Sequence, residues 1–122
     1  MLPLSLLTLS AFSQVDSVEF ILYREQTFKG SVIQYEMRCN GSAIGKIKNG
    51  TVIVYKATAG LVKFEAATET SEVIFIDALP GETYYVRCSV TTGWLAGRPT
   101  FRQVSKEQAL KEIEKNQNHQ KK

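Results

Sequence analysis

The stretch that decides the fold is VIQYEMRCNGSAIGKIKNGTVIVYK, residues 32–56. Apolar and polar residues alternate around two Asn-Gly pairs, Asn40-Gly41 and Asn49-Gly50. Asn and Gly tolerate positive φ, so this dipeptide favours the type I′ turn that closes a two-residue β-hairpin. Two such turns one strand apart predict a three-stranded antiparallel meander.

The same alternation continues on both sides of this stretch. Pro80-Gly81 favours a type II turn, and Gly45 inside an expected strand indicates a β-bulge. The run around Ile74 and Ile76 is nearly continuously apolar, which favours a central strand. We therefore predict an all-β fold, an antiparallel β-sandwich of seven or eight strands within one domain, residues 14–104. Strands are expected at residues 18–24, 32–39, 42–48, 51–56, 61–67, 72–78, 83–90 and 100–104.

The last part of the chain has a different pattern. Ser105 and Gln108 fit the N-cap and N3 positions of a capping box. A narrow apolar stripe follows, made of Ala109, Leu110 and Ile113. The pattern predicts a short C-terminal α-helix over residues 105–117 and a disordered tail over 118–122. The stripe would pack either on the sheet of this chain or on a partner.

Residues 1–13 contain no charge and are rich in Leu and Ser. Ala11 and Ser13 fit the −3 and −1 positions of an export cleavage site, which makes this segment a signal-peptide remnant. It is shorter than the ~20 apolar residues of a membrane span. We expect an exported protein, periplasmic or on the cell surface. The residue directly after the segment is Gln14 and not Cys, so lipid anchoring is not supported. The alternative is an apolar N-terminal strand or helix that belongs to the fold.

Cys39 and Cys88 are the only cysteines. Each lies on the apolar face of its expected strand, so both should point to the core. In an exported domain such a pair is usually a disulfide, and the closed loop would contribute about 4 kcal/mol in the chain-entropy model. The alternative is two buried free thiols that pack as small apolar groups.

Charge and reactive residues exclude several function classes. The formal charge of the 122 residues is +3, and five Lys and three Glu after residue 105 account for two of these charges. No basic face remains for nucleic acid. The single histidine, His119, lies in the expected tail, and Asp77 fits a strand-end carboxylate. We therefore expect no enzyme, no metal site and no cofactor.

The best candidate for a binding surface is the expected loop after residue 90. Trp and Arg are enriched in binding hot spots, and loops at the ends of sandwiches commonly carry function. The alternative is a structural Trp that closes the end of the sandwich, with Arg98 bonded to backbone carbonyls. The candidate binding residues are Trp94, Leu95, Arg98 and Arg102, with Phe28 from an earlier loop.

An ordered set of short motifs supports this class of protein. The motifs are YR at 23–24, NG at 40–41, IGKIKNG at 44–50, PGETYYVR at 80–87 and GRP at 97–99. Over residues 18–104 the set resembles a large bacterial family of small exported β-sandwich domains of unknown function. It is more loosely similar to PEGA-type and carboxypeptidase-regulatory-type modules. The resemblance implies an exported sandwich, often lipid-anchored, with no established catalytic role.

Together, the residues and the resemblance predict a noncatalytic exported domain that binds an envelope protein or glycan. The alternative is a structural accessory module of a cell-envelope assembly. The sequence leaves the oligomeric state open.

Overall fold

The computed structural model describes residues 16–27, 32–67, 72–92 and 97–120. In these ranges the chain forms eight strands and one helix, so the prediction of an all-β sandwich with a C-terminal helix is confirmed. The predicted signal-peptide remnant, residues 1–13, lies outside the described residues. No helix in the described ranges is both long and apolar enough to span a bilayer. The elements are β1 (Ser17–Tyr23), β2 (Tyr35–Cys39), β3 (Ser42–Ile47), β4 (Val52–Thr58), β5 (Gly60–Ala67), β6 (Val73–Ala78), β7 (Thr83–Thr92), β8 (Gly97–Val104) and α2 (Lys106–Gln120).

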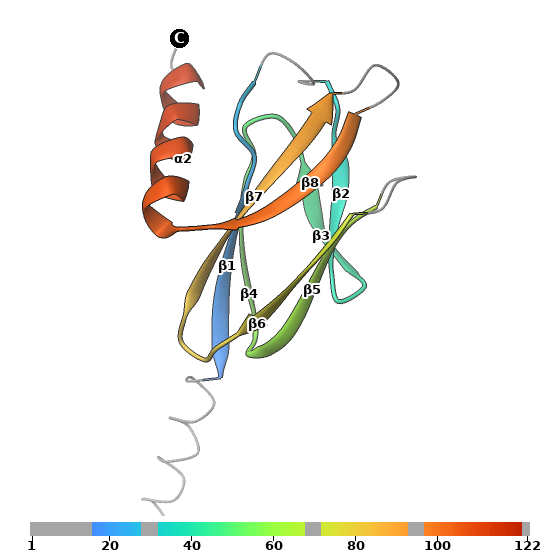
Figure 1. The fold of residues 1–122 in the computed structure, drawn as a ribbon, viewed down its shortest axis with the longest axis vertical. Coiled ribbons are helices and arrows are strands. Elements are labelled where there is room, and N and C mark those ends of the chain that lie inside the picture. The colour runs from blue at the N-terminus through green and yellow to red at the C-terminus, as the bar shows by residue number, and fades with distance from the viewer. Residues whose placement is uncertain (1–15, 28–31, 68–71, 93–96, 121–122) are drawn as a thin grey trace, which may run out of the picture.

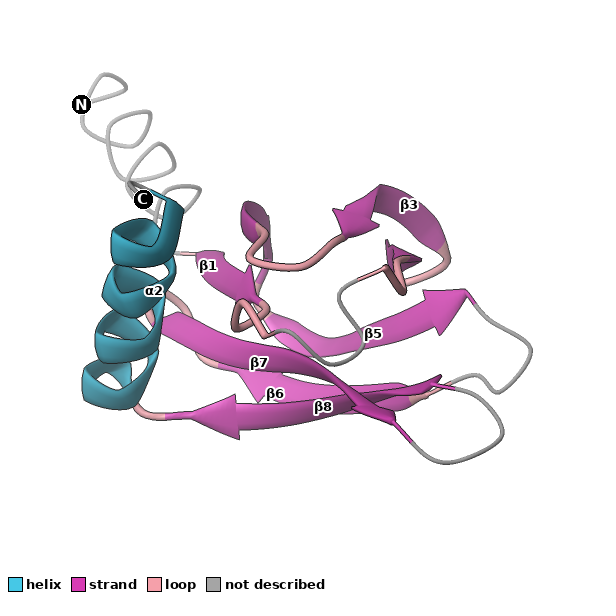
Figure 2. Cartoon of the chain, turned by 90° about the horizontal axis from the view of Figure 1, so that it is seen from above, coloured by secondary structure: helices cyan, strands magenta, loops and turns pink. Residues whose placement is uncertain are grey.

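The strands form two four-stranded sheets packed face to face (Figures 1 and 2). We call them sheet A, with strand order β4-β1-β7-β8, and sheet B, with strand order β3-β2-β5-β6. Neighbouring strands are antiparallel except β1 and β7, which run parallel at the centre of sheet A. The antiparallel prediction therefore holds for every pair but one.

The core lies between the two sheets and follows the predicted alternation. Phe20 and Leu22 of β1 face Met37 and Phe64 of sheet B, and all four are fully buried. The Phe20 ring meets the Phe64 ring edge-on with centroids 4.8 Å apart, and it stacks on Tyr84 at 5.6 Å. The Phe20–Phe64 contact joins the two sheets, whereas Tyr84 is the neighbour of Phe20 within sheet A. Burying one such side chain contributes about 1.5–3 kcal/mol.

The first Asn-Gly pair closes a hairpin as predicted. Asn40 has φ 50° and Gly41 φ 91°, the positive values that a type I′ turn requires, and β2 pairs with β3 across it. The Asn40 side chain also accepts a hydrogen bond from the Lys63 N–H at 2.9 Å. Further along β3 the pairing register shifts beside Gly45, which confirms the bulge. A Cβ at Gly45 would lie 3.0 Å from Ile53 Cδ1.

The prediction for the second Asn-Gly pair is wrong, and so is the meander. β4 does not pair with β3 but crosses to sheet A and pairs with β1. At this turn Gly50 has φ 78°, whereas Asn49 does not have a positive φ. Without two positive φ values the turn does not match the twist of a tight hairpin, so the strands separate. The Asn49 side chain instead brackets Thr27, accepting from its N–H at 2.9 Å and donating to its carbonyl at 3.1 Å.

The run around Ile74 and Ile76 is an edge strand and not a central one. β6 pairs only with β5 in sheet B. Ile76 points into the core, whereas Phe75 points outward and is 59% exposed. The run is apolar because both of its faces carry apolar residues, but only the face toward the core is buried. The hydrophobicity of the run alone does not tell such an edge strand from a central one.

Helix α2 begins where the capping signal placed it. The Ser105 hydroxyl accepts from the Gln108 N–H at 3.2 Å. The helix continues to Gln120, so the predicted disordered tail is wrong for residues 118–120. Ala109 is fully buried against Tyr23 and Tyr85 on the outer face of sheet A, with Ile113 half-buried beside them. The stripe thus packs on the sheet of its own chain, whereas Leu110 stays exposed.

Candidate binding surface

Two of the predicted binding residues are brought together on one strand. Arg98 and Arg102 lie four residues apart on β8, on the outer face of sheet A, and both are exposed. Trp94, Leu95 and Phe28 lie outside the described residues. The predicted loop is also shorter than expected, because β7 extends to Thr92 and β8 already begins at Gly97.

The neighbouring strand lines the same strip with hydroxyl groups. In the register of β7 and β8, Thr91 is opposite Arg98 and Ser89 is opposite Thr100. The Thr91 hydroxyl donates to the Arg98 carbonyl at 3.2 Å. We call the outward side chains of Ser89, Thr91, Arg98, Thr100 and Arg102 the β7–β8 strip. It presents hydroxyl and guanidinium donors side by side.

The two arginines of the strip differ from the arginine next to them. Within the described residues neither Arg98 nor Arg102 forms an ion pair. Arg87, opposite Arg102 in the register, binds Glu25 and lies 3.8 Å from a Glu112 oxygen. Two carboxylates hold the terminal nitrogens of Arg87, although its buried Nε has no hydrogen-bond partner among the described residues. The exposed pair on β8 is available to an external anion.

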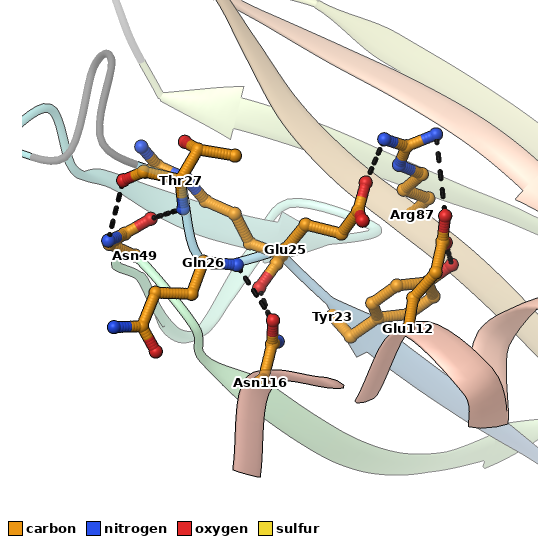
Figure 3. A network of polar contacts seen from close by, with 9 residues as sticks. Tyr23, Glu25, Gln26, Thr27, Asn49, Arg87, Glu112 and Asn116 are labelled. Carbon is orange, nitrogen blue, oxygen red and sulfur yellow. Dashed lines mark hydrogen bonds and ion pairs between the residues drawn. The ribbon is translucent and has the colours of Figure 1, made fainter. Parts of the chain in front are cut away.

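The Arg87 contacts belong to a polar network under α2, shown in Figure 3. Tyr23 of β1 donates its hydroxyl proton to Glu112 of the helix. Burial, together with this bond to a carboxylate, raises the pKa of Tyr23 well above its usual range. The network therefore fixes α2 on sheet A and holds Tyr23 in its neutral form.

Amide side chains hold the segment that follows β1 (Figure 3). Asn116 of α2 accepts from the Gln26 N–H at 2.8 Å and donates to the Arg24 carbonyl at 2.9 Å. Asn49 holds Thr27 from the other side. Sequence reasoning missed this role of Asn116, which stands in the polar end of the helix with no motif around it.

A shallow concavity of about 140 Å³ lies where this segment meets β7. It borders the β7–β8 strip, because Ser89 belongs to both. Its lining is polar apart from one valine: Arg24, Glu25, Thr27, Arg87, Ser89 and Val90.

The predicted disulfide is absent: Cys39 and Cys88 are both buried free thiols. The prediction that both point to the core is confirmed. The Cys88 thiol faces the hydroxyl of Tyr35, at the start of β2, whereas Cys39 lies four residues further and contacts Tyr55. Four residues of a strand span about 13 Å, so the two thiols lie at different positions along the sandwich. Burial raises the pKa of the Cys88 thiol to about 12.

Arg24 is a buried charged residue whose structural role sequence reasoning missed. It is 2% exposed, and its guanidinium donates to the carbonyl of Ile33. Burial lowers the pKa of Arg24, and its side chain connects the end of β1 to the segment that leads into β2.

In the described ranges no three His, Cys, Asp or Glu side chains group around a possible metal position.

Comparison with known proteins adds no relative. No family model matches the chain, and no curated protein or solved structure shows significant similarity to it. The resemblance to the bacterial family of exported sandwich domains therefore stays a prediction.

Proposed function

We propose that this chain is a noncatalytic, exported binding domain whose partner is an acidic protein or glycan of the cell envelope. The observation that carries the proposal is the β7–β8 strip. Arg98 and Arg102 are exposed on one face of one strand and make no ion pair with a described carboxylate. Guanidinium groups bind carboxylates, sulfates and phosphates through paired hydrogen bonds.

The surroundings of the strip support recognition of a polar, anionic chain. Hydroxyl groups of Ser89, Thr91 and Thr100 alternate with the arginines. Those of Ser89 and Thr100 can donate to ring or backbone oxygens, whereas Thr91 already donates to the Arg98 carbonyl and can accept. The β7–β8 pair is long, with eight residue pairs in register, so the backbone under the strip is held by paired strands along its length. Because this backbone is already ordered, binding a ligand does not have to order it.

The direct test compares binding before and after the two guanidinium groups are removed. Polygalacturonate and poly-glutamate on beads serve as an acidic glycan and an acidic polypeptide. We expect Arg98→Ala combined with Arg102→Ala to weaken binding about tenfold or more. Binding by the unchanged chain should also fall with added salt, because the strip is exposed and its charges are screened.

Arg38→Ala is the control on the other sheet, because Arg38 is also an exposed arginine, although it pairs with Glu36 at 3.2 Å. It removes one positive charge from the opposite face, against two in the double variant, and should leave binding within about twofold. Equal binding by the double variant and the unchanged chain, or equal losses in both variants, would contradict the proposal. Capture from an envelope extract treated with protease or with periodate then tells a protein partner from a glycan.

A further inference from the structure

The outer face of sheet B carries an uncovered apolar patch at its β5–β6 corner. Leu61 of β5 and Phe75 of β6 are 67% and 59% exposed, and Leu79, directly after β6, is 61% exposed, although each is large and apolar. Lys63 and Asp77 lie among them on the same face. We call these five residues the β5–β6 patch. The described residues include no segment that covers it.

The strand register arranges four members of the patch as a square. Leu61 is opposite Asp77, and Lys63 is opposite Phe75. Neighbours are about 5 Å apart across the strands and about 7 Å apart along them. One diagonal of the square is therefore apolar, from Leu61 to Phe75, and the other is charged, from Lys63 to Asp77.

This arrangement is complementary to itself. A two-fold axis lying along the apolar diagonal would place Leu61 against Leu61 and Phe75 against Phe75 of a second copy. The same rotation would bring Lys63 of each copy to Asp77 of the other, forming two reciprocal ion pairs. An isologous contact requires such self-matching of one surface.

The charges of the whole face agree with a second copy as the occupant. Among its outward strand residues, three are acidic, Glu36, Glu65 and Asp77, and three are basic, Arg38, Lys46 and Lys63. A face without net charge does not repel its own copy. Lys63 has a partner in its own chain, Glu65 at 3.8 Å, but the pair is long and partly exposed and therefore weak. Lys63 can exchange it for an acid across an interface.

We propose that two copies of this chain associate through the β5–β6 patch, with Leu61 and Phe75 on the two-fold axis and reciprocal Lys63–Asp77 pairs. The patch is small compared with a standard interface of about 800 Å² per partner, so the dimer forms only at high concentration. It leaves the β7–β8 strip of each copy free, on the opposite face of the sandwich. Two strips on one assembly would raise avidity for a repetitive ligand.

Sedimentation velocity over a concentration range that reaches about 1 mM tests the proposal. We expect the mean mass of the unchanged chain to rise toward that of a dimer. Lys63→Asp leaves only acidic groups on the charged diagonal, and Asp77→Lys leaves only basic ones. Each variant alone should stay monomeric, whereas their equimolar mixture should dimerise, because acidic and basic diagonals then face each other.

Two results would overturn the proposal: a monomeric unchanged chain throughout the range, or a mixture no more dimeric than its components. Circular dichroism checks that both variants are folded, which is expected at exposed positions. Arg98→Ala with Arg102→Ala should dimerise like the unchanged chain, so failure of the proposed function and failure of the dimer are separable.

A crosslinking experiment locates the axis. Leu61→Cys and Phe75→Cys should each crosslink to their own copies with a short bismaleimide reagent. Val54→Cys, at an exposed position on the opposite sheet, is the matched control. The natural thiols are buried and do not react in the folded chain. Equal crosslinking at position 54 and at position 61 would contradict the predicted axis.

Discussion

The two outer faces of this sandwich carry similar apolar residues and treat them differently. On sheet A, Tyr23 and Tyr85 point away from the core and are buried, because α2 packs over them. On sheet B, Leu61 and Phe75 also point away from the core, and no described segment covers them. An outward apolar residue on a strand therefore does not by itself indicate a binding surface. Such a residue is available to a partner only when no other segment of the same chain packs over it.

The covered face should be the more sensitive one, and Ala109 is the point at which to test this. Ala109→Asp places a carboxylate at a fully buried position between two tyrosines. We expect it to lower the free energy of unfolding by about 4 kcal/mol, measured by urea denaturation. Leu110→Asp, at the exposed neighbouring position, should change it by less than about 1 kcal/mol. Equal losses would mean that α2 is not docked by its Ala109 side.

The core between the faces should become unstable at alkaline pH. The Cys88 thiol is fully buried with a pKa of about 12, above the usual value near 8.5. As pH rises past that usual value the unfolded chain loses a proton that the folded chain keeps, so the free energy of unfolding falls. We expect a loss of about 2 kcal/mol from this thiol by pH 10. Urea denaturation at pH 8 and pH 10 measures it.

Cys88→Ala provides the control for the alkaline effect. The substitution removes the titrating group, so the difference between pH 8 and pH 10 should shrink. Burial also raises the pKa of Cys39, so part of the loss should remain in this variant. An unchanged pH dependence would show that Cys88 is not responsible.

The polar network under α2 should contribute less than the apolar contact at Ala109. Glu112→Ala removes the acceptor of Tyr23 and one of the two carboxylates beside Arg87. We expect a loss of about 1.5 kcal/mol, because a hydrogen bond to a charged group contributes roughly 1.5–3 kcal/mol. Glu114→Ala changes the same charge at an exposed position of the helix and should have almost no effect. Thermal and urea denaturation of both variants make the comparison.

The smallest effect is expected on the uncovered face. Phe75→Ser removes a large aromatic ring, but the ring is mostly exposed in the single chain. At low protein concentration we expect the free energy of unfolding to change by less than about 0.5 kcal/mol. Tyr85→Ser, under the helix, should cost several times more. A large loss from Phe75→Ser in dilute solution would mean that the patch is covered within one chain.

Alternation and local turn chemistry suffice to predict most of this fold. Val18, Phe20 and Leu22 are buried as their spacing indicates, and Asn40-Gly41 closes its hairpin. The second Asn-Gly pair shows the limit, because the dipeptide permits two positive φ values without enforcing them. Asn49 does not have a positive φ, and its side chain is hydrogen-bonded to the Thr27 backbone. No local pattern in the sequence predicts a partner 22 residues away.

The site was harder to predict than the fold. Arg98 and Arg102 could be selected by residue type, but their shared outward face depends on where β8 begins. Cys39 and Cys88 were correctly placed in the core, yet their separation depends on how the two sheets are offset. Asn116 joins a helix to a segment 90 residues earlier, and that contact exists only after both have docked.

The parallel pairing of β1 with β7 has a consequence for the order of folding. Hairpins such as β2–β3 and β5–β6 close short loops, whereas β1 pairs with β7 across a separation of 64 positions, from Glu19 to Thr83. Closing a long loop costs more chain entropy than closing a short one, so contacts distant in sequence form late. We therefore expect sheet B to form early and the centre of sheet A to be completed last. The helix docks across β1 and β7, so its docking surface exists only at the end of folding, and the apolar stripe of α2 stays uncovered until then.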